Sequence, residues 1–205
     1  MPIGDNGTSS AEQLMPEALS NAAARFVDSL KINSISEAVR RGQQVVIKRR
    51  HVYGEQLTEL ANLYFRMAGL PIRFWTKTEN WQRWEVKCFK MLNGDRFRAS
   101  RLRSNAICID QLPGESLWEH LNRHTLSRRM VEAAGFEFRR AHQFWSKEFR
   151  GPWSHGDAGL ANVIYDGKSN RARLIDFEIV HDKTLPALSR HADDLLIFLL
   201  DLVAT

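Results

Sequence analysis

Apolar side chains recur at steps of three and four residues in several segments of the chain, which is the spacing of one face of an α-helix. Gly69 and Pro71 end one such segment, and Asn93-Gly94-Asp95 ends the next. The pattern predicts helices over Glu55–Ala68, Glu79–Leu92, Ser127–Lys147 and Ala192–Val203, and a short one over Ser116–Arg123. Asp193 and Asp194 then stand near the start of the last helix, where a carboxylate is favourable.

Short runs of β-branched and apolar residues predict strands. The first, Gln43–Lys48, ends in a lysine, and two more cover about Phe97–Leu102 and Ala106–Asp110. Segments Asn162–Tyr165 and Arg173–Asp176 predict a hairpin, which lies between the long helix and the last one. Strands and helices therefore come first and helices dominate later, an order that predicts a two-lobed α+β fold.

Composition narrows the class of protein. The chain has 205 residues, of which 43% are hydrophobic and 26% charged, close to the average of folded globular proteins. Global disorder, a fibre and a large multidomain protein are thereby excluded. The formal net charge of +5 favours anionic partners such as nucleotides, phosphosugars, acidic membrane surfaces or nucleic acid, without choosing among them.

The two cysteines and the N-terminus bear on location. Cys88 and Cys108 each stand in apolar surroundings and far from a second metal ligand, so we expect buried free thiols. The N-terminal residues lack the basic start and apolar run of a signal peptide, and no run is long enough to span a membrane. These features predict a cytoplasmic protein, with a peripheral position at the inner membrane face as a further expectation.

The strongest chemical signal lies between Ser154 and Glu178. Asn162 follows Asp157 by five residues, and Asp176 follows Asn162 by 14, a distance that one hairpin spans. The hairpin returns the chain to its start, so these three side chains are expected around one small space. Oxygen ligands grouped in this way suit Mg²⁺, which is usually held by one or two carboxylates together with phosphate oxygens.

The same residues carry a family resemblance. The loop His155-Gly156-Asp157 with Asn162 resembles the motif H-x-D-x-x-x-x-N, and Asp176-Phe177-Glu178 resembles D-F-x. The chain thus resembles the protein-kinase-like superfamily, in particular its small atypical bacterial members: lipopolysaccharide-core sugar kinases, RIO-like kinases and aminoglycoside phosphotransferases. This implies a kinase-like fold with a small N-lobe sheet and helix over about residues 22–110, a hinge at about 110–114 and a shortened, mostly helical C-lobe over about 115–205. Residues 1–21 are expected to form a loose arm.

The resemblance implies ATP and Mg²⁺ as cofactors and assigns roles to Asp157, Asn162 and Asp176. Asp157 would orient the substrate hydroxyl and accept its proton, and Asn162 and Asp176 would hold Mg²⁺. His155 is expected to be structural rather than a base.

Other positions match the superfamily's nucleotide site. Lys48 would contact the α- and β-phosphates, and Glu85, on the helix Glu79–Leu92, would pair with it. Backbone groups of about Asp110 and Leu112 would meet adenine. Asp194 resembles the buried aspartate that holds the catalytic loop from beneath.

The expected acceptor of the phosphate follows from a short connection and a missing motif after Asp176. Only 17 residues separate Asp176 from Asp194, with no A-P-E motif, so a sugar, a lipopolysaccharide-type glycan or another small hydroxyl compound is expected rather than a peptide. An atypical Ser/Thr protein kinase stays an alternative. A nucleotide-binding pseudokinase is another, because Glu178 replaces the glycine of D-F-G and no glycine-rich loop precedes Lys48.

A third alternative rests on basic residues. Arginine pairs occur at Arg40-Arg41, Arg49-Arg50, Arg128-Arg129 and Arg139-Arg140, and Arg96, Arg98, Arg101 and Arg103 follow one another closely. They could form a surface that binds RNA or a membrane. Aromatic residues do not interleave with them at the spacing of a binding module, so most are expected to be solvated charges.

Overall fold

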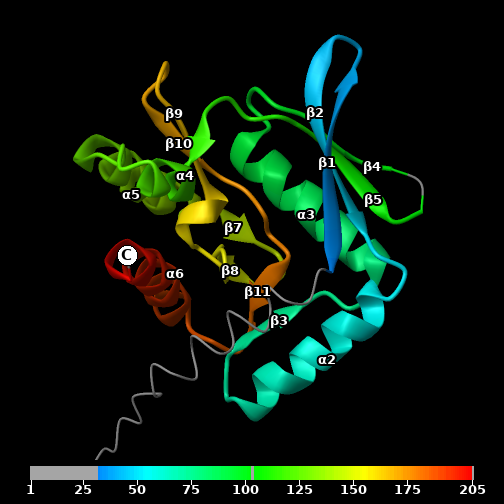
Figure 1. Cartoon of the computed structure of the whole chain (residues 1–205). Helices are drawn as coiled ribbons and strands as arrows, with labels where there is room; N and C mark the ends of the chain where they lie inside the picture. The colour runs from blue at the N-terminus through cyan, green and yellow to red at the C-terminus, as the bar shows by residue number, and fades with distance from the viewer. Residues whose placement is uncertain (1–31, 103, 205) are drawn as a thin grey trace, which may run out of the picture. The chain divides into compact units, whose positions relative to one another are not determined.

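The structure is a computed structural model, which describes residues 32–102 and 104–204 (Figure 1). All of these residues belong to one compact unit, residues 31–205. The loose arm predicted for residues 1–21 lies outside the described residues, and the predicted lobe boundaries stay a prediction.

A four-stranded antiparallel sheet forms one part of the unit, with the order β1-β2-β5-β4. Its strands are β1 (Asn33–Arg40), β2 (Gln43–Arg50), β4 (Ala99–Arg101) and β5 (Ala106–Asp110). Arg41 and Gly42 join β1 to β2 with φ angles of 51° and 76°, the left-handed pair that a tight hairpin needs. In register, Lys48 pairs with Ile107 and Val46 with Ile109, so these residues share a face of the sheet.

Two helices accompany this sheet, α2 (Gly54–Met67) and α3 (Thr78–Asn93). Helix α3 buries Trp81, Trp84 and Glu85 and exposes Arg83, Lys87 and Lys90. Its apolar stripe therefore faces β4, β5 and the rest of the core, as the periodicity predicted.

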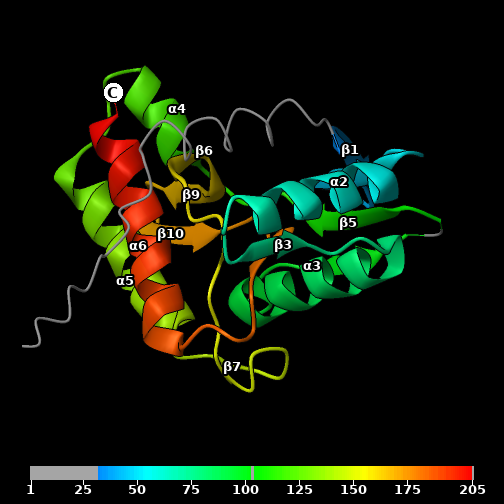
Figure 2. The ribbon, with the colours of Figure 1, turned by 90° about the horizontal axis from the view of Figure 1, so that it is seen from below.

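The later part of the chain is mostly helical. A capping box between Ser116 and Glu119 begins the short helix α4 (Leu117–Asn122), which follows β6 (Glu115–Ser116). Helix α5 (Arg128–Ala141) and helix α6 (Ala187–Val203) lie side by side (Figure 2), and Phe138 meets Phe198 between them at a centroid distance of 5.3 Å. The remaining elements are β7 (Trp145–Ser146), β8 (Gly151–Pro152), η1 (Leu160–Asn162), β9 (Val163–Asp166) and β10 (Arg171–Leu174).

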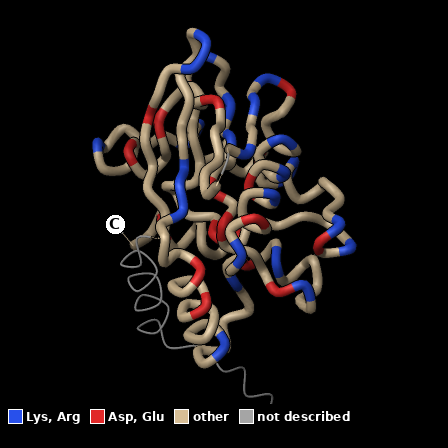
Figure 3. Tube along the Cα trace, turned by 90° about the vertical axis from the view of Figure 1, so that its right-hand side faces the viewer, with Lys and Arg blue, Asp and Glu red and all other residues tan. Residues whose placement is uncertain are grey.

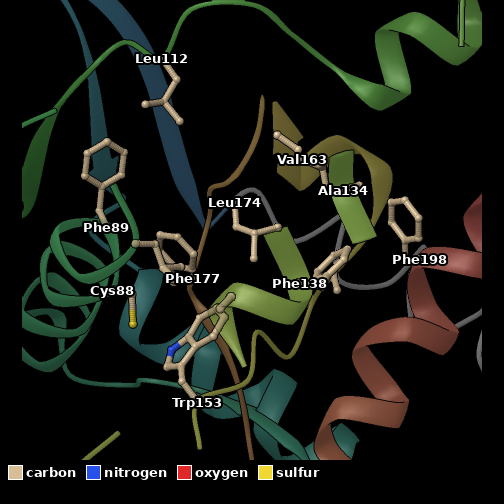
Figure 4. Close-up of a cluster of buried hydrophobic side chains, with 14 of the residues drawn as sticks. Cys88, Phe89, Leu112, Ala134, Phe138, Trp153, Val163, Leu174, Phe177 and Phe198 are labelled. Atoms are coloured by element: carbon tan, nitrogen blue, oxygen red, sulfur yellow. The ribbon is translucent and has the colours of Figure 1, made fainter. Parts of the chain in front are cut away.

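Besides the three-stranded sheet β10-β9-β6 and the pair β7-β8, a two-stranded sheet connects the two regions. Strand β3 (Ile72–Phe74), from the connection between α2 and α3, pairs with β11 (Ile179–His181), which directly follows Asp176-Phe177-Glu178. One apolar core runs through both regions: Phe89, Phe177, Trp153, Leu174 and Phe138 all belong to it (Figure 4). Cys88 and Cys108 are buried free thiols, as predicted.

The predicted α+β class with a small sheet and a mostly helical second lobe is confirmed. Two predicted bounds are wrong. The helix predicted over Ser127–Lys147 ends at Ala141, because residues 142–152 turn back to pair β7 with β8. The last helix begins at Ala187 rather than Ala192, so Asp194 lies inside the helix and not at its start. Within the described residues, no helix has both the length and the apolar character that crossing a membrane requires.

Candidate active site

Lys48 lies at the centre of a buried group of carboxylates. Its Nζ is 2.5 Å from Asp176 Oδ1, 3.4 Å from Glu85 Oε1 and 3.3 Å from Glu178 Oε2. Burial alone would lower the pKa of the Lys48 ammonium, but the surrounding carboxylates, Asp176 first, raise that pKa above its ordinary value. The Lys48 ammonium therefore links β2 to α3 and to the segment that carries Asp176 and Glu178.

Glu85 reaches this group from α3. One of its carboxylate oxygens faces Lys48, and the other accepts a hydrogen bond from the backbone N–H of Phe177 at 3.1 Å. Burial raises the pKa of Glu85, and Lys48 opposes that rise. Glu85 thereby ties α3 both to the strand that carries Lys48 and to the segment that carries Asp176, the arrangement predicted for the lysine–glutamate pair.

The loop before η1 is held from beneath by Asp194. Its two carboxylate oxygens accept the backbone N–H groups of His155 and Gly156, each at 2.8 Å. Gly156 has a φ of 91°, and a Cβ there would lie 2.9 Å from Ile179 O, so the position requires glycine. The predicted anchoring by Asp194 is thus present in the geometry, although from the middle of a helix.

His155 is a structural residue in this arrangement. Its Nε2 lies 2.9 Å from Ile175 O, and its Nδ1 lies 3.3 Å from the backbone N–H of Asp157. An Nε2–H that donates to Ile175 and an unprotonated Nδ1 satisfy both contacts, so the neutral ring fits. Burial lowers the pKa of His155, which favours the same state.

Asp157 and Asn162 are side-chain neighbours, as the spacing predicted. Asn162 Nδ2 donates to Asp157 Oδ2 at 3.1 Å and to Asp157 O at 2.9 Å. Burial, with Asp176 and Glu178 as nearby negative charges, raises the pKa of Asp157 to about 7. The backbone of Asn162 also accepts the N–H of Ile175 at 3.0 Å, which fixes the loop beside the segment carrying Asp176.

The donor set could hold a divalent cation. Asp176 supplies carboxylate oxygens, and Asn162, whose Nδ2 is engaged by Asp157, has its amide oxygen left for a ligand. In the described part of the chain, no three His, Cys, Asp or Glu side chains form a complete metal cage. Mg²⁺ takes several of its ligands from water and phosphate oxygens, and the three carboxylates around Lys48, those of Glu85, Asp176 and Glu178, provide negative charge.

The predicted hinge residues lie at the end of β5. The backbone N–H of Asp110 donates to Arg98 O at 2.8 Å, and the Asp110 carboxylate accepts from the Arg98 N–H at 2.9 Å. Leu112 is buried in the core (Figure 4). Gly114, with a φ of 103°, packs so closely on β9 that a Cβ would lie 2.0 Å from Tyr165 O.

Sequence reasoning missed several contributors. Glu178 could have been solvated, yet its side chain is 19% exposed, pairs with Lys48 and accepts a hydrogen bond from Asn33 Nδ2. Arg50, counted among the basic surface pairs, is instead buried over the Trp81 ring and donates to Trp75 O at 2.7 Å. Asp201 in α6 accepts the N–H of Leu160 at 2.9 Å. The available signal was a charged residue next to the D-F motif, as for Glu178, or within an apolar helix, as for Asp201. The spacing of residues in the sequence did not indicate which groups these charges would contact.

No protein-family model matches the chain, and no curated protein sequence matches it. Among solved structures it is similar to Rv3197 from Mycobacterium tuberculosis, in complex with erythromycin, with 14% identity and a TM-score of 0.45 over 89% of this chain and 63% of that one. It is also similar to the bifunctional kinase-methyltransferase WbdD, with 19% identity and a TM-score of 0.42 over 77% of this chain and 32% of that one. The chain thus spans less than two thirds of either protein.

These similarities are low, and the class of the fold rests on the chain's own elements. A strand lysine, a helix glutamate, an aspartate-held loop and Asp176, which follows the β9–β10 hairpin, meet in one place. They define a small two-lobed, kinase-like α+β fold.

Proposed function

We propose that this chain is an ATP- and Mg²⁺-dependent phosphotransferase that transfers the γ-phosphate to a hydroxyl group. The observation that carries the proposal is the position of Lys48, whose Nζ contacts Glu85 on α3 and Asp176 behind the hairpin at the same time. A lysine shared by a helix glutamate and a second, partly exposed carboxylate is suited to a triphosphate with its cation.

Asp157, Asn162 and Asp176 divide the chemistry in this proposal. Asp157 accepts the proton of the acceptor hydroxyl as its oxygen forms a bond to the γ-phosphorus, and the bond to the β–γ bridging oxygen breaks to release ADP. Asn162 and Asp176 would hold Mg²⁺, which supplies charge neutralisation at the phosphate oxygens. Placement and electrostatics provide most of the rate increase, because the transferred group needs little covalent help.

Half-buried apolar residues support an adenine site beside Lys48. Val46 and Ile109 are cross-strand neighbours on the Lys48 face of the sheet. Ile164 and Ile175 are also half-buried and come from the hairpin region. Apolar side chains from the sheet and from the hairpin would enclose the base, and backbone groups near Leu112 would bind its edge.

The connection after Asp176 supports a small acceptor. Residues 182–186 alone separate β11 from α6, and Asp182 closes them into a turn by accepting the N–H of Thr184 at 2.8 Å. This leaves no extended segment on which a peptide could lie. A sugar, a lipopolysaccharide-type glycan or another small hydroxyl compound is therefore the proposed acceptor class.

Glu178 favours one second candidate, a nucleotide-binding pseudokinase. Its carboxylate lies 3.3 Å from Lys48 Nζ, where it would compete with a phosphate for the ammonium group. In that case the chain would bind nucleotide and regulate a partner without transferring phosphate.

The test combines transfer with binding. The full chain is incubated with γ-labelled ATP, Mg²⁺ and small-molecule and cell-envelope extracts, and labelled products and ADP are measured. We expect acceptor-dependent ADP that Asp157→Asn reduces by about 10²-fold or more, with the nucleotide-induced rise in melting temperature retained. Asp166→Asn, at the end of β9 beside the exposed hairpin turn, is the matched control.

Two outcomes would overturn the proposal. Turnover that persists in Asp157→Asn would remove its catalytic role. A melting shift with ATP and Mg²⁺ but no turnover on any acceptor would establish the pseudokinase, and labelled protein in place of small products would establish a protein kinase.

A further inference from the structure

A groove lined by basic side chains runs between α3 and the edge strand β4, outside the carboxylate group around Lys48. Three adjoining concavities make it up, with volumes of about 600, 550 and 480 Å³. Lys90 lines all three, and Arg101 and Ser100 each line two, so the concavities are continuous. We call this feature the basic groove.

Its positive charges form two rows. Arg83, Lys87 and Lys90 are the exposed residues of α3 after Glu79, and steps of three or four residues place their side chains about 5–6 Å apart on one face. Arg98 and Arg101 flank the groove from the β4 side. Arg40 and Arg41, at the tip of the β1–β2 hairpin, extend it; Figure 3 shows Lys and Arg (blue) at this tip, at the top of the view.

Few described acidic groups offset this charge. Among the described residues that line the three concavities, Asp110 is the one acidic residue, and its carboxylate pairs with Arg98. Glu79 lies 3.5 Å from Arg83 and 3.9 Å from Arg101, but these side chains are 49–69% exposed, so the pairs are weak. In the described ranges, no carboxylate pairs with Lys87 or Lys90.

We infer that the basic groove binds a single-stranded nucleic acid through its phosphate backbone. Repeated cations along a groove match a ligand with repeated phosphates, whereas one phosphosugar would need only two or three of them. The absence of any exposed large apolar side chain among the described lining residues disfavours insertion into a membrane surface. The described lining also lacks an exposed aromatic ring, so binding without base preference is expected.

The test uses the full chain and a fluorescein-labelled oligouridylate of about 12 nucleotides, a length that one such groove can contact. Anisotropy titrations are made between roughly 50 and 200 mM KCl. With about five phosphates neutralised, the slope of log K against log[KCl] is expected near −3.5, which is a loss of about 100-fold in affinity over this range. The inference does not depend on phosphate transfer, so ATP and Mg²⁺ are omitted.

Charge reversal locates the site. Lys87→Glu/Lys90→Glu is expected to weaken binding by about 10-fold or more and to make the slope shallower by about 1.4. Arg139→Glu/Lys168→Glu changes the net charge equally on exposed positions outside the groove and should change affinity by less than about 2-fold. If the first variant melts early, Lys87→Gln/Lys90→Gln gives the same comparison.

Three results would overturn the inference. The first is RNA binding that does not weaken as the salt concentration rises. The second is an equal loss of affinity in the groove variant and the control variant. The third is no RNA binding although anionic phosphatidylglycerol vesicles or inorganic polyphosphate bind. The last result would assign the groove to a different polyanion.

Discussion

Lys48 Nζ and Asp176 Oδ1 lie 2.5 Å apart although the two residues are 128 positions apart in the chain. Their contact joins a strand of the first sheet to the residue that follows the β9–β10 hairpin. Asp176 adopts a φ of 58°, a left-handed conformation that is uncommon outside glycine, and the surrounding hydrogen bonds hold it there. The centre of the candidate site is therefore a long-range contact that the whole unit must fold to form.

Replacing Lys48 should destabilise the fold as well as the site. Lys48→Met leaves Glu85, Asp176 and Glu178 facing one another without a cation, and the loss of one partner from a buried ion group costs about 3 kcal/mol. Urea unfolding measures this loss, and Lys147→Met, at an exposed position, is the control. Lys48→Met/Glu178→Gln should recover part of the loss because one carboxylate is neutralised; a double variant no more stable than Lys48→Met would refute the coupling.

Asp194 should contribute more to stability than its neighbour Asp193. Asp194 is fully buried and accepts hydrogen bonds from His155 N, Gly156 N and His142 Nε2 at 2.8–2.9 Å. Asp194→Ala leaves these donors unpaired and should lower the free energy of unfolding by about 3 kcal/mol or more. Asp193→Ala removes one pair, with His181, from a carboxylate that is 36% exposed, and should cost about 1 kcal/mol. Equal losses in chemical denaturation would contradict this ranking.

Gly156 and Gly42 separate steric crowding from backbone conformation. Both have a positive φ, 91° and 76°, but a Cβ at Gly42 meets nothing within 4 Å, whereas one at Gly156 lies 2.9 Å from Ile179 O. Gly42→Ala should therefore cost about 1–2 kcal/mol through φ alone. Gly156→Ala should cost clearly more and reduce ATP turnover, since β11 or the loop carrying Asp157 must move. Similar melting temperatures for the two variants would show that the loop adapts freely.

The sequence pattern predicted those elements whose bounds depend on interactions between residues close together in the chain. The bounds of β5 were predicted as observed, and those of α2 and α3 to within one residue, because each has an apolar face and a clear stop signal. The position of Asp157 beside Asn162 was also predicted, because the two residues are only five positions apart and their contact is local in the chain. The end of α5 was missed because Phe144 and Trp145 continue its apolar period, although the chain reverses there to pair β7 with β8.

The missing features depend on partners far away in the chain. Strand β3 has three residues and exists through pairing with β11, more than 100 residues later. The position of Glu178 depends on Lys48 and Asn33, and the burial of Arg50 depends on Trp81. None of these has a local period, so a one-dimensional pattern leaves them undetermined.

The buried histidines should contribute less to the stability of the fold as the pH decreases from neutrality. The His142 and His191 rings stack at a centroid distance of 3.9 Å. His191 Nε2 lies 3.0 Å from Trp153 O, just before the loop that carries His155. Burial, and then His142, lowers the pKa of His191 below the ordinary 6.5, and burial lowers that of His155. Below this pH the unfolded chain takes up protons that the folded chain does not, which favours unfolding.

Asp194 extends this loss to lower pH. Burial alone would raise its pKa, but hydrogen bonds and the nearby histidines, His142 first, lower it below the ordinary 3.8. A carboxylate with a lowered pKa stabilises the fold above its unfolded value, and that contribution disappears as the pH falls through the folded value. The lowered pKa values therefore act to decrease the urea midpoint between about pH 7 and 5, through the histidines, and again near pH 4 and below, whereas the raised pKa of Asp157 acts in the opposite direction as the pH falls below about 7. Relative to the parent chain, His191→Asn should lose the part of the midpoint decrease between about pH 7 and 5 that comes from His191, whereas Lys147→Met should follow the parent profile; identical profiles for His191→Asn and the parent would show that His191 does not titrate with folding.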